Sequence, residues 1–192
     1  MKLYLVRHGE TEWNREHRIQ GREDIPLNEE GKHQAEYCAK SLAGKKLDCI
    51  VSSPLARAKD TATAIAAFHT QTPFAAMDGL VERDFAKSSG ALPEEIKKIR
   101  EKNGGSLPGA EERSAVAKRA GECFRQLFSE YPQGEVLAVT HGGVISAVLD
   151  YFGGPGYHGI FLDNVFISVL EVTKEGFKVV EVNVSPEIVG AS

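Results

Sequence analysis

Two patterns in the sequence predict a three-layer α/β/α fold built around a mostly parallel sheet. Short apolar runs of strand length alternate with longer segments of helical periodicity, as in proteins whose parallel strands are joined by crossover helices. Near the end of the chain, two alternating runs at 164–172 and 177–184 flank a Lys-Glu-Gly turn and predict an antiparallel hairpin at the sheet edge. With 192 residues there is room for one well-packed domain and little for a second, so we expect a single domain over 1–192.

The first half of the chain is expected to contain three strands, at 2–6, 47–52 and 73–77. The polar segment from Thr11 to Asn28 has weak periodicity and is interpreted as an active-site loop with one helical turn. Asn28 is expected to cap a helix that runs to about Leu42, because an Asn side chain accepts from free N–H groups in the first turn. Pro54 is expected at the first position of a second helix that ends near residue 68.

The second half begins with an irregular stretch, which we interpret as a small insertion at about 83–110 over one end of the sheet. It is expected to contain one short charged helix at 93–102. A long amphipathic helix follows at 111–131, then an apolar strand at 135–140 and a helix at 144–152. Each of these elements continues the alternation that a parallel sheet requires.

Composition excludes several classes of protein. The net charge of −4 without blocks of like charge does not indicate a nucleic-acid-binding surface. No apolar stretch approaches the roughly 20 residues that span a bilayer, and no signal-peptide pattern precedes the first strand, so no membrane partner is expected. Three cysteines without a C-x-x-C pair are expected to be buried apolar residues in a reducing compartment, which favours a cytoplasmic location.

Three of the predicted strands end in polar sequences that suit phosphate chemistry. The first ends at Arg7-His8-Gly9, the second at Ser52-Ser53-Pro54 with Arg57 in the following helix, and the strand at 135–140 ends at Thr140-His141-Gly142-Gly143. Because the carboxyl ends of parallel strands lie at one edge of a sheet, we expect His8, Arg57 and His141 to converge there.

These residue types fit phosphoryl transfer. Guanidinium groups bind phosphate oxygens bidentately, free N–H groups at a helix start add donors, and a neutral imidazole is a competent nucleophile. One histidine is expected to attack while the other, protonated, stabilises the transferring group. A metal site is disfavoured because no H-E-x-x-H or Cys/His ligand spacing occurs and two arginines would repel the ion. No G-x-G-x-x-G follows the first strand, so a dinucleotide site is not indicated.

The ordered series of motifs from residue 7 to residue 143 resembles the histidine phosphatase superfamily, branch 1, which has a phosphoglycerate-mutase-like fold. The matching segments are Arg7-His8-Gly9-Glu10-Thr11, Trp13-Asn14, Gln20-Gly21, Ser52-Ser53-Pro54-Leu55-Ala56-Arg57-Ala58, Leu80-Val81-Glu82-Arg83, Pro108-Gly109-Ala110-Glu111 and Thr140-His141-Gly142-Gly143. The resemblance implies a metal-independent phosphatase with no cofactor, which hydrolyses a small phosphorylated metabolite through a phosphohistidine.

The resemblance also implies a role for each matching residue. His8 would be the nucleophile, with its Nδ1–H held by a backbone carbonyl, and Arg7, Arg57 and His141 would form the phosphate pocket. Glu82 would protonate the leaving oxygen and then activate water, with Glu111 and Asp84 as alternative acids. Asn14, Gln20 and Gly21 would line the substrate mouth, and Gly142 would offer a backbone donor.

The chain departs from the family pattern after Glu82. Residues 86–90 read Ala-Lys-Ser-Ser-Gly where many members place a glycine first, and Ala86 reaches positive φ less easily than glycine does. The path of this loop, and the reach of Glu82, are therefore left open.

Three functions remain as alternatives. The short insertion and the Ile19-Gln20-Gly21-Arg22 sequence favour a phosphatase over a cofactor-dependent phosphoglycerate mutase, which would need a well-closed pocket. A phosphate-binding regulatory protein with little turnover is the third. Phe161 and Phe166 beside the hairpin are compatible with a homodimer and with core packing alike.

Overall fold

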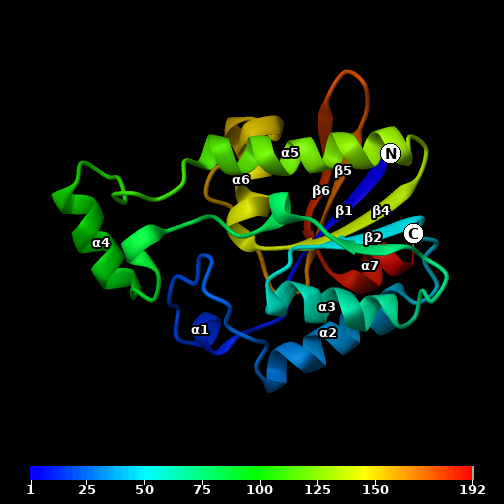
Figure 1. Ribbon diagram of the computed structural model, residues 1–192, viewed down its shortest axis with the longest axis horizontal. Coiled ribbons are helices and arrows are strands. Elements are labelled where there is room, and N and C mark those ends of the chain that lie inside the picture. The colour runs from blue at the N-terminus through cyan, green and yellow to red at the C-terminus, as the bar shows by residue number, and fades with distance from the viewer. Residues whose placement is uncertain (192) are drawn as a thin grey trace.

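A six-stranded sheet forms the middle layer of the protein, for which a computed structural model describes residues 1–191 (Figure 1). The strands lie in the order β3-β2-β4-β1-β5-β6. Their bounds are Lys2–Arg7 for β1, Cys49–Ser52 for β2, Phe74–Ala76 for β3, Glu135–Thr140 for β4, Ile167–Val172 for β5 and Phe177–Val184 for β6. The first four strands pair in parallel, and the β5–β6 hairpin adds an antiparallel edge beside β1. The predicted fold class is confirmed.

Apolar side chains on alternate positions of each central strand bury both faces of the sheet. In β1, Leu3 and Leu5 belong to the core beneath α5 (Arg113–Glu130) and α6 (Gly142–Gly153). Tyr4 and Val6 point to the other core, beneath α2 (Glu29–Leu42), α3 (Ala56–Ala66) and α7 (Pro186–Gly190). Figure 1 shows these two helical layers above and below the sheet. Burial on both faces explains why the strands read as continuous apolar runs.

Three helices begin at residues other than those expected, among them α5, which starts at Arg113 and not at residue 111. The helix after β2 starts at Ala56 instead of Pro54, because the Asp24 carboxylate accepts the Ala56 N–H at 2.7 Å and so supplies the cap from a distant loop. The helix after β4 starts at Gly142, two residues before the expected start, with His141 in extended conformation at its N-cap. The short helix α7 was not predicted, and it packs its Val189 into the core beside α2.

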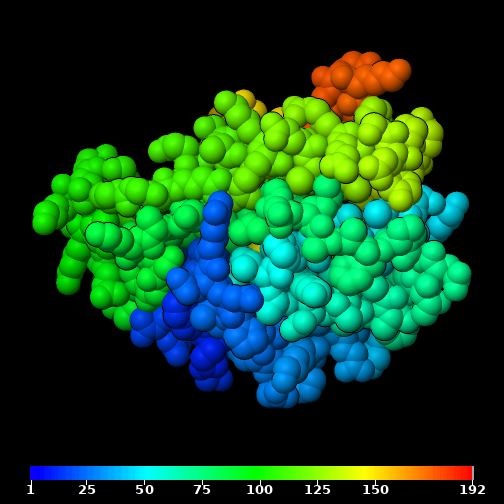
Figure 2. Space-filling view, in the orientation of Figure 1, coloured from blue at the N-terminus to red at the C-terminus, as the bar shows by residue number. Residues whose placement is uncertain are grey.

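The segments that surround the carboxyl edge of the sheet lie outside the three layers. They are the single-turn α1 (Glu12–Arg15), the 3₁₀ turns η1 (Asp78–Leu80), η2 (Ala86–Ser88) and η3 (Pro155–Tyr157), and α4 (Pro93–Lys102). Figure 2 shows the blue N-terminal loop lying against the green segment around α4. Backbone hydrogen bonds from Ile19 to Ala91 and from Gly90 to Ile19 join these two segments into one rim.

Among the helices within residues 1–191, none combines the length and the apolar character needed to cross a membrane.

Candidate active site

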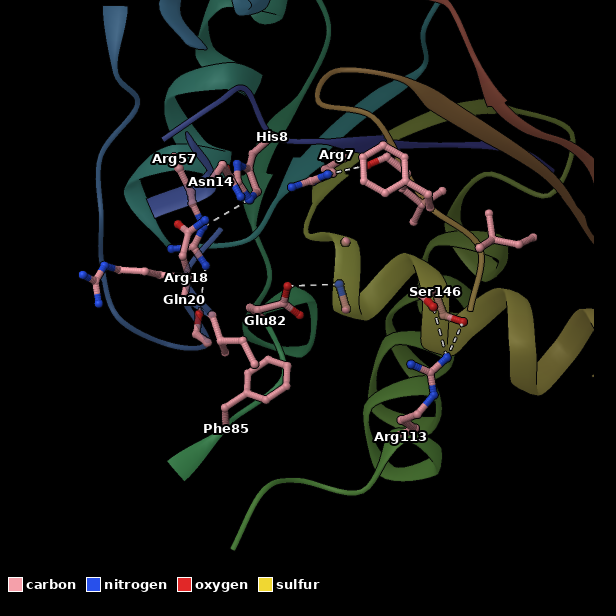
Figure 3. Close-up of a pocket in the computed structure, with 17 residues that line it drawn as sticks. Arg7, His8, Asn14, Arg18, Gln20, Arg57, Glu82, Phe85, Arg113 and Ser146 are labelled. Atoms are coloured by element: carbon pink, nitrogen blue, oxygen red, sulfur yellow. Dashed lines mark hydrogen bonds between the residues drawn. The ribbon is translucent and has the colours of Figure 1, made fainter. Parts of the chain in front are cut away.

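The expected strand ends meet at one cavity of about 330 Å³ (Figure 3). Arg7 and His8 reach it from the end of β1, Arg57 from the first turn of α3, and Glu82 from the segment after η1. His141 follows β4 and lies just behind the cavity wall, fully buried, with its ring centroid 5.2 Å from that of His8. The structure therefore brings together the five residues for which catalytic roles were predicted.

His8 is held in one orientation, with the lone pair of Nε2 directed at the Nε–H of Arg57. Its Nδ1 lies 2.6 Å from the carbonyl oxygen of Gly9, so Nδ1 carries the proton and donates it. The backbone of His8 is fixed by the Thr140 carbonyl and the Asn164 amide. Burial, with the nearby charges of Arg57 and Arg7, holds the pKa of His8 well below its ordinary value. The imidazole is thus neutral and nucleophilic at neutral pH.

Arg57 is a fully buried cation whose donors are directed by backbone carbonyls. Its Nη1 donates to Glu23 at 2.7 Å and its Nη2 donates to Gly21 at 2.9 Å. Its Nε–H points to His8 Nε2 at 3.3 Å, the atom at which a phosphoryl group would be received. Burial lowers the pKa of Arg57 from its ordinary high value, and the charge of Glu82 opposes that shift. The guanidinium is therefore anchored before any substrate arrives.

His141 is oriented by Ser53, a residue to which no role was assigned from the sequence. Its Nε2 lies 2.8 Å from Ser53 Oγ, which also accepts the N–H of Leu55, and we assign the Ser53 hydroxyl as the donor to Nε2. The ring proton of His141 then lies on Nδ1, a buried atom with no partner within residues 1–191. An N–H in that position is ready to donate to a bound oxygen.

The protonation expected for His141 differs from the one that its surroundings support. Burial, followed by the charge of Arg57 and the neighbouring His8, holds the pKa of His141 well below its ordinary value. The ligand-free site therefore contains two neutral imidazoles, whereas one protonated ring was expected. A neutral Nδ1–H still donates a hydrogen bond, and the fixed positive charge comes from the arginines instead.

Arg7 provides the second guanidinium. Its Nη1 donates to the carbonyl of Leu162, while its Nε is buried without a partner among the described residues. Unsatisfied buried donors are rare in folded proteins. Arg7 Nε and His141 Nδ1 are two such donors in one small site, and the oxygens of a bound anion would satisfy both.

The Glu82 carboxylate is fixed by two backbone donors. Oε1 accepts the N–H of Arg83 at 2.7 Å, and Oε2 accepts the N–H of Gly143, at the start of α6, at 3.0 Å. The side chain is 8% exposed and lines the cavity. It lines the same cavity as His8 and Arg57 (Figure 3).

The two alternative acids are directed elsewhere. Glu111 forms a bidentate pair with Arg119, at 2.8 and 3.0 Å, and does not line the cavity. Burial acts to raise the pKa of Glu111, but the hydrogen bonds from Arg119 and the Asp84 N–H outweigh it and lower the pKa. Asp84 accepts the N–H of Ala86 and also lies outside the cavity wall. Glu82 is the acid that the geometry favours.

The residues expected at the substrate mouth all line the cavity. Asn14 holds the Thr11 N–H through its Oδ1, and Gln20 presents a buried side chain whose Oε1 has no partner in the described part of the chain. Gly21 adopts φ +54°, a conformation that directs its carbonyl to Arg57. Gly142 is the first residue of α6, so its N–H has no acceptor within the helix and lies at the pocket.

Further lining residues were not predicted. Arg18 and Arg113 add two cations to the wall, and Figure 3 shows Arg113 reaching Ser146 on α6, across the cavity from Arg57. An apolar side of the mouth is formed by Ile19, Phe85, Ile160, Phe161 and Leu162. Ile19 and Phe85 lie in or beside matching motifs but were given no role, and Arg18, Arg113, Ile160 and Leu162 reach the site only through the fold.

The departure at Ala86 does not remove Glu82 from the site. Ala86 adopts φ +49°, the left-handed conformation that glycine takes readily, and its N–H is bonded to Asp84 Oδ1 at 2.7 Å. The loop therefore keeps a glycine-like turn despite the Cβ atom.

No group of three or more His, Cys, Asp or Glu side chains suited to hold a metal ion occurs within residues 1–191.

Known proteins resemble this chain in sequence and in structure over nearly its whole length. The uncharacterized phosphatase PhoE of Bacillus subtilis is 34% identical over 188 residues, which cover 97% of this chain and 96% of that protein. Bacillus stearothermophilus YhfR superposes with a TM-score of 0.86 at 27% identity, covering 97% of this chain and 98% of the other. A mutant phosphoserine phosphatase of Entamoeba histolytica in complex with phosphoserine superposes with a TM-score of 0.82 at 28% identity, covering 95% and 96%.

The family model that matches the chain extends over residues 3–185, nearly its whole length. It includes all three strand ends and the acidic loop, so the resemblance noted from the motifs is confirmed. The chain belongs to the histidine phosphatase superfamily, branch 1.

Proposed function

We propose that this protein is a phosphatase that hydrolyses a small phosphomonoester through a phosphohistidine at His8, without a metal ion. One observation carries the proposal. A neutral imidazole whose Nε2 accepts a hydrogen bond from Arg57 lies beside two buried donors, Arg7 Nε and His141 Nδ1, that have no partner in the described chain. Such a site suits the spread negative charge of a transferring phosphoryl group.

In the first step, Nε2 of His8 attacks phosphorus, the N–P bond forms and the bond from phosphorus to the ester oxygen breaks. Arg7, Arg57, His141 and the Gly142 N–H hold the phosphoryl oxygens. Glu82 in its protonated form gives its proton to the leaving alcohol. In the second step, Glu82 takes a proton from water, the resulting hydroxide attacks phosphorus, and the N–P bond breaks to release phosphate and free His8.

The open mouth of the cavity favours hydrolysis over mutase chemistry. A mutase must protect its phosphohistidine from water while the substrate turns, yet here α4 extends to the side of the sheet (Figure 1). At the rim Phe161 is 75% exposed, and about a third of the Arg18 side chain is in contact with solvent. A water molecule can reach His8 after the alcohol leaves.

The proposal is tested with an aryl phosphate in the presence of EDTA. We expect full activity with the chelator, and a loss of about 10² to 10⁴ in kcat for Glu82→Gln, the usual range for a general acid. Loss of activity on chelation would contradict the metal-independent mechanism. An unchanged kcat in Glu82→Gln would assign the acid role to another residue.

A screen of phosphorylated metabolites, with phosphoglycerate mutase activity assayed in parallel, identifies the substrate. The phosphoserine complex of the Entamoeba histolytica relative supports a small phosphorylated molecule as the substrate class. Isomerisation of phosphoglycerate faster than its hydrolysis would favour the mutase. Phosphate binding without turnover of any metabolite would favour a regulatory protein.

We also propose a cytoplasmic location. In support, Cys38, Cys49 and Cys123 are free thiols; Cys38 and Cys49 are buried as expected, whereas Cys123 is only half-buried. A homodimer stays a prediction: Phe161 is exposed, whereas Phe166 is half-buried against the fold.

A further inference from the structure

A second cavity adjoins the catalytic pocket on the far side of Arg113. Its volume is about 620 Å³, and Arg113 lines both cavities. Two more arginines face it from separate segments: Arg83, which follows Glu82 in the chain, and Arg100 on α4. Three guanidinium groups from three elements therefore surround one hollow that the proposed reaction does not use.

The positive charges of this cavity are only partly matched by protein groups. Arg113 donates to Asp150 at 3.3 Å, and the same carboxylate lies 3.2 Å from His158. Glu112, the other acid in the wall, is exposed and forms no ion pair within residues 1–191. Within residues 1–191, three arginines thus line the cavity with only two carboxylates. One of the two, Asp150, already contacts both Arg113 and His158.

The donors of Arg83 and Arg100 are largely free. Arg83 uses its Nε on the Glu111 carbonyl at 2.6 Å and rests over the Phe85 ring at 5.1 Å, which leaves both terminal nitrogens available. The guanidinium of Arg100 contacts no acceptor in the described part of the chain. Burial lowers the pKa of Arg83, the charges of Arg113 and Arg100 lower it further, and the Glu112 and Glu82 carboxylates act against this shift.

The start of α5 adds backbone donors to the same wall. Arg113 and Ser114 are its first two residues and both line the cavity, and no side chain caps this 18-residue helix. Uncapped N–H groups at a helix start carry a partial positive charge. They reinforce the three guanidinium groups around one space.

We propose that this second cavity binds an anionic group, a phosphate or a carboxylate, directly beside the catalytic pocket. Arg83 and Arg113 would hold it on the catalytic side and Arg100 would close over it from α4. The anion has two sources with the same chemistry: the far end of a substrate with two anionic groups, or a separate small anion. The first source rests on the phosphatase function proposed above, and the second does not.

Binding is tested by calorimetric titration with inorganic pyrophosphate, with and without saturating vanadate in the catalytic pocket. We expect two sites per chain without vanadate and one with it. Arg100→Gln, at an exposed position, should weaken the vanadate-insensitive site by about tenfold or more, in line with the loss of a charged hydrogen bond. Arg83→Gln should do the same, whereas Lys98→Gln, which removes an equal charge from α4 outside the cavity, should leave it unchanged.

The two sources are separated by kinetics with linear alkanediol bisphosphates and the matching alkyl monophosphates. A preference for bisphosphates that Arg100→Gln abolishes assigns the anion to the substrate. A preference unaffected by Arg100→Gln, together with pyrophosphate binding, assigns it to a separate ligand. Absence of a site in vanadate-saturated protein, or a site that survives both Arg100→Gln and Arg83→Gln, overturns the proposal. The titration needs no turnover, so a catalytically inert chain would refute the phosphatase function without deciding this site.

Discussion

Ser53 determines which nitrogen of His141 faces the substrate. With the Ser53 hydroxyl as the donor to His141 Nε2, the ring proton lies on Nδ1, the nitrogen that has no partner within residues 1–191. A reversed tautomer would present a lone pair to a phosphoryl oxygen and repel it. Ser53 therefore acts on the reaction through His141, as a positioning residue.

Replacement of Ser53 by alanine removes this control. We expect Ser53→Ala to lower kcat/KM for an aryl phosphate by about tenfold, equivalent to the loss of one hydrogen bond of about 1.4 kcal/mol, with the pH profile altered. Ser53→Thr keeps the hydroxyl and should restore most of the activity. Equal kcat/KM and pH profiles in Ser53→Ala and the native chain would show that His141 is oriented without Ser53.

The first turn of α6, which follows β4, is hydrogen-bonded to the Glu82 carboxylate. Gly143 donates its N–H to Glu82 Oε2, and a Cβ atom on Gly143 would overlap Oε1 of the same carboxylate. Glycine lets the helix backbone approach the Glu82 side chain this closely, and a larger residue would force the carboxylate to move. The first turn of α6 thus holds the Glu82 carboxylate in one position.

A methyl group at this position should displace the acid. Gly143→Ala is expected to lower kcat for an aryl phosphate by about 10² or more, the lower end of the contribution of a general acid. Gly44→Ala, where the new Cβ meets open space, is the control and should retain native activity. Native kcat in Gly143→Ala would show that Glu82 needs no fixed position, and circular dichroism of both variants checks that the fold is intact.

Helices and strands that depend on residues nearby in the chain were predicted from the sequence. The prediction was least accurate where a residue far away in the chain sets the start of a helix. The apolar run of β1 and the Asn28 cap of α2, which accepts the Gly31 N–H, depend on neighbours in the chain. The start of α3 depends on Asp24, which lies in a loop some 30 residues earlier. No pattern around Ala56 contains that information.

Residues of the site were likewise predictable only where they lie in a motif of the sequence. His8, Arg57 and Glu82 were predicted because each lies in a motif of defined order. The role of Arg113 at the wall shared by two cavities follows from the packing of α5 against α6, and so could not be seen in its own sequence. The positive φ of Ala86 shows that surrounding contacts can impose a turn that alanine disfavours.

The molecule as a whole keeps two neutral imidazoles buried among arginines. Burial holds the pKa values of His8 and His141 well below the ordinary value of about 6.5. Above that pH neither the folded nor the unfolded chain protonates them, so they do not affect stability. Below it the unfolded chain binds protons that the folded chain excludes, and the free energy of unfolding falls.

This linkage predicts acid sensitivity. Between about pH 6.5 and pH 5.5 each of the two histidines should lower the free energy of unfolding by up to about 1.4 kcal/mol per pH unit. Urea denaturation at several pH values measures the slope, which should be shallower in His8→Asn and in His141→Asn. His33→Asn, which removes an exposed imidazole from α2, is the control. An equal slope in all four proteins would mean that the two buried rings do not carry the effect.

A single cooperative unfolding transition in the same experiments is expected if residues 1–192 form one domain. Two separate transitions would instead indicate that the segment around α4 unfolds independently.

The most direct test of the account is to trap the phosphorylated protein. Brief reaction with a labelled phosphomonoester, quenched in base, should yield an acid-labile, base-stable phosphate on the peptide that contains His8. His8→Ala should abolish this label, and His33→Ala should leave it intact. A label that persists in His8→Ala, or that maps to any other residue, would contradict nucleophilic attack by His8.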